Sequence, residues 1–320
     1  MDGLLVIDKP SGPSSHDVVA RVRRALGEPR IGHTGTLDPA ATGVLPLVLG
    51  RATRLARFLS AGDKTYEAIV RLGAATDTYD GAGTPAGPAY RGALPSREEV
   101  DRALDAFRGT FLQQPPAYSA KKIDGRRSYR IARAAARQSA SGVSAAPALP
   151  AAPALPASPA LPAPVRVTAH RIVLVSVEGD MATLNVDCSA GFYVRALAHD
   201  LGVRLGIGAH LLALRRTRSG EATLDDALAL DAIEREPALA IRSVVPLSRM
   251  LPGLSSVTLT SDGVRRALHG RDLGPGDVVR AEKGVGSDPF FRLIGPAGDL
   301  VAIGTPAGAS GLLHPAVVLV

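Results

Sequence analysis

The chain of 320 residues has no tryptophan, and aromatic residues make up only 4% of it. Its one cysteine, Cys188, cannot form an intramolecular disulfide, and no Cys/His cluster has the spacing of a zinc site. No stretch approaches the roughly 18 uncharged apolar residues of a membrane helix. The apolar run at the start is too short for a signal peptide. We therefore expect a cytoplasmic protein with no bound metal and no membrane contact.

Positive charge is in excess, with a formal net charge of +7. Such an excess favours a polyanionic partner, most commonly nucleic acid, although a solvated basic surface explains the charge alone equally well. Grouping favours phosphate binding, because adjacent phosphates need local positive density. The groups are Arg21, Arg23, Arg24 and Arg30; Arg51, Arg54 and Arg57; Lys121, Lys122, Arg126, Arg127, Arg130, Arg133 and Arg137; and Arg215, Arg216 and Arg218.

Strand-like and helix-like patterns alternate without repeating βαβ units, which predicts an α+β fold with a mixed sheet. Residues 64–72 alternate as one strand, and residues 31–50 are expected to form a long loop with a short strand at 44–49. Helices are expected from Ser14 or Ser15 to Leu26, from the capping box at residues 96–99 to about residue 107, and from about residue 192 to 205. Further strands are expected at 4–7, 165–177 and 181–188.

Two composition changes divide the chain. Residues 141–164 are almost all Ala, Pro, Leu and Ser, and proline at this density blocks both helices and strand ladders. We interpret them as a disordered insertion inside one domain, residues 1–245, because strands needed by that domain lie on both sides. Residues 246–320 show short β-rich runs between Gly and Pro residues and are predicted to form a small second domain.

The segment richest in possible chemistry is residues 32–43, GHTGTLDPAATG. It presents one carboxylate, Asp38, one imidazole, His33, and several hydroxyls in a glycine-rich loop. Considered locally, Asp38 before Pro39 is most simply a turn or a helix cap. The local pattern therefore leaves a structural role and a catalytic role open.

The segment as a whole resembles the catalytic loop of the TruB family of pseudouridine synthases, in which the aspartate is the catalytic residue. Other segments resemble family motifs in the same order and spacing. They are residues 3–10, 64–68, 114–122, 188–197 and 208–217. The resemblance covers nearly all of residues 3–245 apart from the insertion, and residues 246–320 resemble the PUA-type RNA-binding domain of some members.

The resemblance implies a tRNA-modifying isomerase without a cofactor, which converts the uridine at position 55 of the T loop to pseudouridine after flipping it out. Asp38 would be the catalytic carboxylate, and Arg195 would pair with it. Tyr66 would stack on the flipped uracil, and Tyr193 and Leu214 would line the same pocket. Without the resemblance, the residues other than Asp38 read as ordinary core or surface positions.

RNA contacts are expected from residues of the basic segments and of the catalytic loop. By resemblance, His33 would fill the gap that the flipped base leaves. The remaining contacts are assigned to Lys64, Lys121, Lys122, Arg126, Arg127 and Arg130. The partner would be the T arm of tRNA, bound by a monomer.

The sequence departs from the family pattern in two places. The insertion lengthens the RNA-gripping segment 117–165, and Phe192 stands where a smaller residue is usual.

Two alternative functions are left open. A related synthase that uses a guide RNA is one alternative, although the chain ends without the lysine-rich tail usual in that group. A non-catalytic RNA-binding protein is the other, and the presence of Asp38, Tyr66 and Arg195 argues against it as the sole role.

Overall fold

The computed structural model describes residues 1–118, 122–123, 126–127, 162–282, 289–308 and 312–319. These residues form two compact units. Unit 1 contains residues 1–62 and 216–320, and unit 2 contains residues 63–215. Strand β10 (Ala209–Ser219) belongs to unit 2 up to residue 215 and to unit 1 from residue 216.

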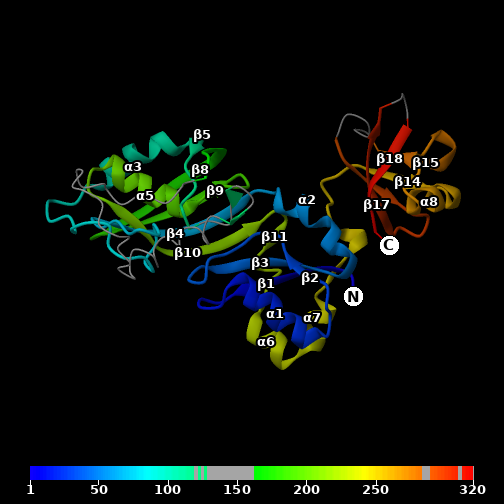
Figure 1. The fold of residues 1–320 in the computed structure, drawn as a ribbon, viewed down its shortest axis with the longest axis horizontal. Helices are drawn as coiled ribbons and strands as arrows, with labels where there is room; N and C mark the ends of the chain where they lie inside the picture. The colour runs from blue at the N-terminus through cyan, green and yellow to red at the C-terminus, as the bar shows by residue number, and fades with distance from the viewer. Residues whose placement is uncertain (119–121, 124–125, 128–161, 283–288, 309–311, 320) are drawn as a thin grey trace, which may run out of the picture. The chain divides into compact units, whose positions relative to one another are not determined.

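Unit 1 begins with a sheet built around β1. This strand pairs antiparallel with β3 and β13 and parallel with β12, while β2 pairs with β3 and β11 with the end of β10. Helices α1, α6 and α7 lie together beside β1 (Figure 1). The bounds are β1 (Gly3–Lys9), α1 (Ser15–Leu26), β2 (Ile31–His33), β3 (Thr42–Leu49), a 3-10 turn η1 (Gly50–Leu55), α2 (Ala56–Ser60), β11 (Ala222–Thr223), β12 (Leu228–Ala229), α6 (Leu230–Arg235), α7 (Pro237–Arg242) and β13 (Val245–Pro246).

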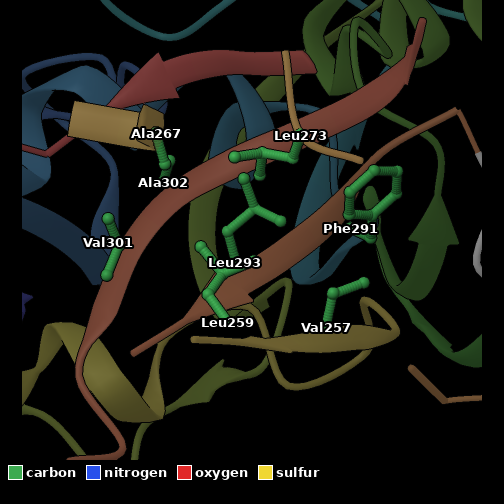
Figure 2. Close-up of a cluster of buried hydrophobic side chains, with 8 residues drawn as sticks. All are labelled: Val257, Leu259, Ala267, Leu273, Phe291, Leu293, Val301 and Ala302. Atoms are coloured by element: carbon green, nitrogen blue, oxygen red, sulfur yellow. The ribbon is translucent and has the colours of Figure 1, made fainter. Parts of the chain in front are cut away.

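The last part of unit 1 is a five-stranded sheet in the order β15-β14-β16-β17-β18, with α8 packed beside it. Figure 2 shows its buried core, in which Phe291 lies among the aliphatic side chains of Val257, Leu259, Leu273, Leu293 and their neighbours. The predicted β-rich C-terminal part is confirmed. The bounds are η3 (Leu247–Arg249), β14 (Ser256–Leu259), α8 (Ser261–Leu268), η4 (Pro275–Asp277), β15 (Val278–Ala281), β16 (Phe291–Ile294), β17 (Leu300–Ala307) and β18 (Leu312–Val318).

Unit 2 holds an antiparallel sheet in the order β4-β9-β8-β5. The alternation predicted for β4 is confirmed, because Tyr66, Ala68, Val70 and Leu72 are all buried on one face. The bounds are β4 (Lys64–Leu72), α3 (Arg97–Leu104), η2 (Asp105–Phe107), β5 (Gly109–Gln113), β6 (Lys122–Ile123), β7 (Arg126–Arg127), β8 (Val165–Glu178), β9 (Met181–Cys188) and α5 (Val194–Arg204).

Helix starts were predictable because their signals are local. Ser14 caps α1 in a capping box with Asp17, and Ser96 caps α3 in the same way with Glu99. The expected long loop at residues 31–50 is wrong in extent, because β2 and β3 form a hairpin and leave only residues 34–41 as loop. Residues 141–161 of the proposed insertion lie outside the described residues.

Candidate active site

Asp38 lies in the loop between β2 and β3. The loop starts where the Thr34 amide donates to the Pro46 carbonyl at 3.1 Å, and the Ala41 amide donates back to the Asp38 carbonyl at 3.0 Å. This second bond closes a tight turn around the Asp-Pro pair. The side chain of Asp38 is half-buried, so the turn presents the carboxylate at the protein surface without leaving it fully in water.

The start of α1 holds the loop just before Asp38. The Ser15 hydroxyl donates to the Leu37 carbonyl at 3.0 Å and accepts from the Leu37 amide at 2.9 Å. Ser15 and Leu37 are both buried. On the other side of Asp38, the Gly12 amide donates to the Pro39 carbonyl at 2.8 Å. The two neighbours of Asp38 are therefore fixed, Leu37 to the first residue of α1 and Pro39 to the segment that links β1 and α1.

Lys9, at the end of β1, is fully buried below the loop. Its ammonium donates to the carbonyls of Pro10, Pro39 and Ala41 at 2.9, 3.0 and 2.6 Å. Burial lowers the pKa of Lys9 to about 8, against the opposing effect of the Asp38 carboxylate, which raises it. Lys9 thus remains mostly protonated at neutral pH and places a buried cation beneath the loop that carries Asp38.

Arg216 holds both ends of the loop. It is 1% exposed, its Nε donates to the Val44 carbonyl at 2.7 Å, and its Nη2 donates to the Gly35 carbonyl at 3.0 Å. The interpretation of Arg216 as part of a phosphate-binding group is therefore wrong. Its guanidinium is used inside unit 1 to stabilise the loop.

His33 ends β2, immediately before this loop. Its ring is half-buried and meets the ring of His16 edge-on, with centroids 5.4 Å apart. Asp38 and His33 are the two predicted site residues that lie in unit 1.

Tyr66, Tyr193, Arg195 and Leu214 lie in unit 2. Tyr66 is 8% exposed on the same face of β4 as Lys64, which is also buried. Tyr193 precedes α5. The side-chain amide of Gln113 bonds the Tyr193 backbone twice, accepting from its amide at 2.8 Å and donating to its carbonyl at 3.0 Å. Leu214 is half-buried in β10.

Arg195 lies in the first turn of α5 and is 8% exposed. Its Nη1 donates to the Thr78 carbonyl at 3.1 Å and lies 3.6 Å from Oδ2 of Asp80, while its Nη2 donates to the Tyr118 carbonyl at 2.9 Å. Sequence reasoning missed the loop that supplies Thr78 and Asp80. The dense Asp, Thr and Gly residues of positions 76–84 indicate a structured turn, but their link to Arg195 is a contact distant in sequence.

The remaining predicted RNA-binding residues lie outside what the structure describes. Lys121 and Arg130 are outside the described residues, as are the side chains of Lys122, Arg126 and Arg127, whose backbone forms β6 and β7. Within the described ranges, no three His, Cys, Asp or Glu side chains gather as they would to hold a metal ion. None of the helices described has the length and apolar character needed to cross a membrane.

Comparison with known proteins adds to this geometry. The model of the TruB family pseudouridylate synthase N-terminal domain matches residues 23–143, and that of the tRNA pseudouridylate synthase B C-terminal domain matches residues 195–251. A protein of Solibacter usitatus named tRNA pseudouridine synthase B is 42% identical over the full length of both chains. The chain belongs to the TruB family. It is therefore an isomerase that converts uridine to pseudouridine, as the resemblance implied.

A second relative agrees with this assignment, and a more distant structure shares the fold. A relative of the same name from Symbiobacterium thermophilum is 42% identical over 84% of this chain and 82% of its own. A chain in the structure of an H/ACA RNP bound to a substrate RNA matches with a TM-score of 0.70 and 23% identity, over 99% of this chain and 85% of that one. The second match shows the fold alone, and it confirms the predicted α+β class.

Proposed function

We propose that this TruB-family enzyme acts on tRNA and isomerises the uridine at position 55 of the T loop, with Asp38 as its catalytic carboxylate. The observation that carries the proposal is the construction of the Asp38 loop. Lys9, Ser15 and Arg216, all buried, hold the backbone of this loop at three points, the carbonyls of Ala41, Leu37 and Gly35. A mere turn does not require a buried ammonium and a buried guanidinium beneath it, since each is expensive to desolvate.

The reaction needs no electrons and no cofactor. The bond from N1 to the ribose carbon breaks, the base turns over, and C5 forms the new bond; one proton leaves C5 and N1 gains one. Asp38 acts at the step that breaks the N1 bond, helped by the cation of Lys9 and, in our proposal, by pairing with Arg195. Tyr66 stacks on the uracil, and its hydroxyl takes the C5 proton.

Access to the base requires that the uridine leave the RNA stack. His33, at the start of the Asp38 loop, is assigned to the gap that the base leaves. Lys64 is buried beside Tyr66, so we assign it to a nucleotide inside the pocket and not to open phosphates. Tyr193 and Leu214 complete the pocket.

Phosphate contacts are assigned to the basic segment that contains Lys121, Lys122, Arg126, Arg127 and Arg130. The net charge of +7 supports a polyanionic substrate, and the names of the curated relatives support tRNA over other RNAs. We propose a cytoplasmic monomer that binds the T arm, with residues 246–320 as a PUA-like domain. The relatives' names also favour this reading over a guide-RNA enzyme.

The test is Asp38→Asn, with Asp225→Asn as the control because Asp225 is an exposed carboxylate of the same unit. Single-turnover release of tritium from 5-tritiated uridine in a tRNA transcript measures the chemistry, and filter binding measures affinity. We expect Asp38→Asn to slow turnover by about a thousandfold or more. Its tRNA affinity should stay within a few fold, because phosphate contacts elsewhere dominate binding.

Two outcomes contradict the proposal. Retained turnover in Asp38→Asn removes Asp38 from the chemistry and favours the non-catalytic RNA-binding alternative. Loss of binding together with turnover makes Asp38 a structural cap of its loop. A transcript with cytidine in place of the uridine at position 55 tests specificity, because product formed at another position of that transcript would contradict the proposed target.

A further inference from the structure

Tyr79 has a backbone conformation that L residues rarely adopt. Its φ is +66°, in the left-handed region that favours glycine, and it lies in the loop between β4 and α3. A tyrosine persists there only when its surroundings over-determine the conformation. The contacts that Tyr79 and its neighbours make therefore indicate the role of this strained residue.

The left-handed turn places both neighbours of Tyr79 against one guanidinium. The Thr78 carbonyl accepts from Nη1 of Arg195 at 3.1 Å, and Oδ2 of Asp80 lies 3.6 Å from the same nitrogen. Asp80 is itself held in place, because its Oδ1 accepts from the Thr78 hydroxyl at 2.6 Å. One residue on each side of Tyr79 thus positions Arg195.

The ring of Tyr79 stacks on the ring of His199, with centroids 3.8 Å apart and planes 11° from parallel. His199 follows Arg195 by four residues on α5, so the two side chains lie on the same face of that helix. The loop therefore touches α5 at two points, one turn apart: through the guanidinium of Arg195 and through the ring of His199.

Further contacts hold the stacked rings in place. The Leu211 amide donates to the Tyr79 carbonyl at 2.9 Å, and the Gly81 amide donates to the Leu211 carbonyl at 2.9 Å, which anchors the loop to β10. Nδ1 of His199 is buried with no hydrogen bond within the described residues. Stacking against Tyr79 therefore helps to hold the imidazole ring in place. Burial lowers the pKa of His199 and, with the Asp200 carboxylate, raises that of Tyr79, so both rings are uncharged at neutral pH.

We propose that Tyr79 and His199 are positioning residues for Arg195: their stacked rings clamp the 78–80 loop to α5, so that Thr78 and Asp80 hold the guanidinium in its active orientation. This inference rests on the proposed function, in which Arg195 acts in the site. Tyr79 does not touch the substrate in this role. It holds the left-handed turn that aims two acceptors at one nitrogen.

Tyr79→Gly is the informative variant. Glycine adopts the left-handed conformation easily, so the loop can still fold, but the ring anchor is lost. We expect the single-turnover rate constant to fall about tenfold while the tRNA Kd stays within about twofold. Tyr79→Phe keeps the stack and should stay within about twofold of wild type. Tyr90→Gly is the matched control, since Tyr90 is an exposed tyrosine of the same unit.

A double-mutant cycle with Arg195→Lys separates positioning from general weakening. If Tyr79 acts through Arg195, Tyr79→Gly should lower the rate less than about twofold in the Arg195→Lys background. A tenfold fall in both backgrounds, or no fall in either, overturns the inference.

A crystal structure of Tyr79→Gly tests the inference without relying on an activity measurement. We expect the contact of Arg195 Nη1 with the Thr78 carbonyl to be lost or disordered, and a guanidinium unchanged at 3.1 Å overturns the inference. A wild-type protein inactive on tRNA contradicts the proposed function instead. The crystal structure of Tyr79→Gly still decides the role of Tyr79 in that case.

Discussion

The ammonium of Lys9 lies 2.6 Å from the carbonyl oxygen of Ala41, at the far end of the loop that carries Asp38. The same nitrogen also bonds the Pro39 carbonyl at 3.0 Å. One buried cation therefore fixes the two residues on either side of Ala40 and lies close enough to Asp38 for the carboxylate to raise its pKa. The conformation of the loop that carries Asp38 therefore depends on this one buried side chain.

Lys9→Met should destabilise the protein and slow its reaction. The substitution keeps the apolar stem but removes the ammonium from three carbonyls, of which that of Pro39 keeps the Gly12 amide as a donor. Each carbonyl left unsatisfied costs about 1–3 kcal/mol, offset in part because the ammonium no longer has to be buried. We expect a net loss of about 2 kcal/mol in denaturant unfolding and a larger loss of turnover than of tRNA affinity. Arg24→Met, an exposed change on α1, controls the stability measurement for the lost charge. A Lys9→Met protein as stable and active as wild type would contradict this account of the loop.

Gly43→Ala should be far more harmful than Gly27→Ala. Both glycines have positive φ, +99° and +63°. A Cβ on Gly43 would lie 2.2 Å from the Arg216 carbonyl oxygen, whereas a Cβ on Gly27 meets nothing within 4 Å. We expect Gly27→Ala to cost about 1 kcal/mol from backbone strain alone and Gly43→Ala about 3 kcal/mol or more, in thermal or denaturant unfolding. Equal losses in the two variants would show that the β3 backbone can move away from Arg216.

Asp200→Asn should change how stability depends on pH. Burial raises the pKa of Asp200 to about 6 from its ordinary 3.8, so the native state binds a proton more tightly than the unfolded chain. The contribution of this carboxyl is thus fully present below about pH 4 and is lost as pH rises through about 6. We expect Asp200→Asn to exceed wild type by about 1 kcal/mol above pH 7, after allowing for solvent screening, and the difference to vanish below about pH 4.

Denaturant unfolding at several pH values measures this difference. Asp225→Asn, at an exposed position, controls for the removal of one carboxylate. An Asp200→Asn advantage that grows towards acid would have the wrong sign and would refute the raised pKa.

Features set by neighbouring residues were predictable. The capping boxes at Ser14 and Ser96 are four-residue signals, and the burial of one face of β4 follows from strict alternation. The Asp38 loop was identified by its resemblance to a family motif, because local physics alone favours a simple turn for an Asp-Pro pair.

Features set by contacts distant in sequence were not predictable. Arg216 reads as one of three clustered basic residues, yet it is buried against Gly35 and Val44, more than 170 positions earlier in the chain. Tyr79 is an unusual residue for a left-handed turn, and it is held there by its stack with His199 and by the bond from the Leu211 amide, both of which join it to residues more than 100 positions later. Charge pattern and propensity carry no information on such partners.

Arg195→Lys should remove most of the turnover while leaving the fold intact. The guanidinium reaches three acceptors in different directions through two nitrogens: the carbonyls of Thr78 and Tyr118 and the carboxylate of Asp80. A lysine ammonium carries the same charge on a single nitrogen and lacks the planar fork, so it cannot keep all three contacts in one orientation. We expect turnover to fall by about a hundredfold and the tRNA Kd to change by less than about threefold, because orientation is lost and phosphate contacts are not.

Arg204→Lys provides the comparison for this prediction, since it makes the same substitution at an exposed position in the last turn of the same helix. Turnover and tRNA binding are measured side by side for both variants, and thermal unfolding confirms that each is folded at the assay temperature. If Arg195→Lys turns over as fast as Arg204→Lys, the guanidinium geometry has no part in the reaction, and neither the proposed pairing with Asp38 nor the positioning role of Tyr79 can stand. If only Arg195→Lys is slow and its binding is kept, the loss lies in the chemical step, as expected for a guanidinium that orients the catalytic carboxylate.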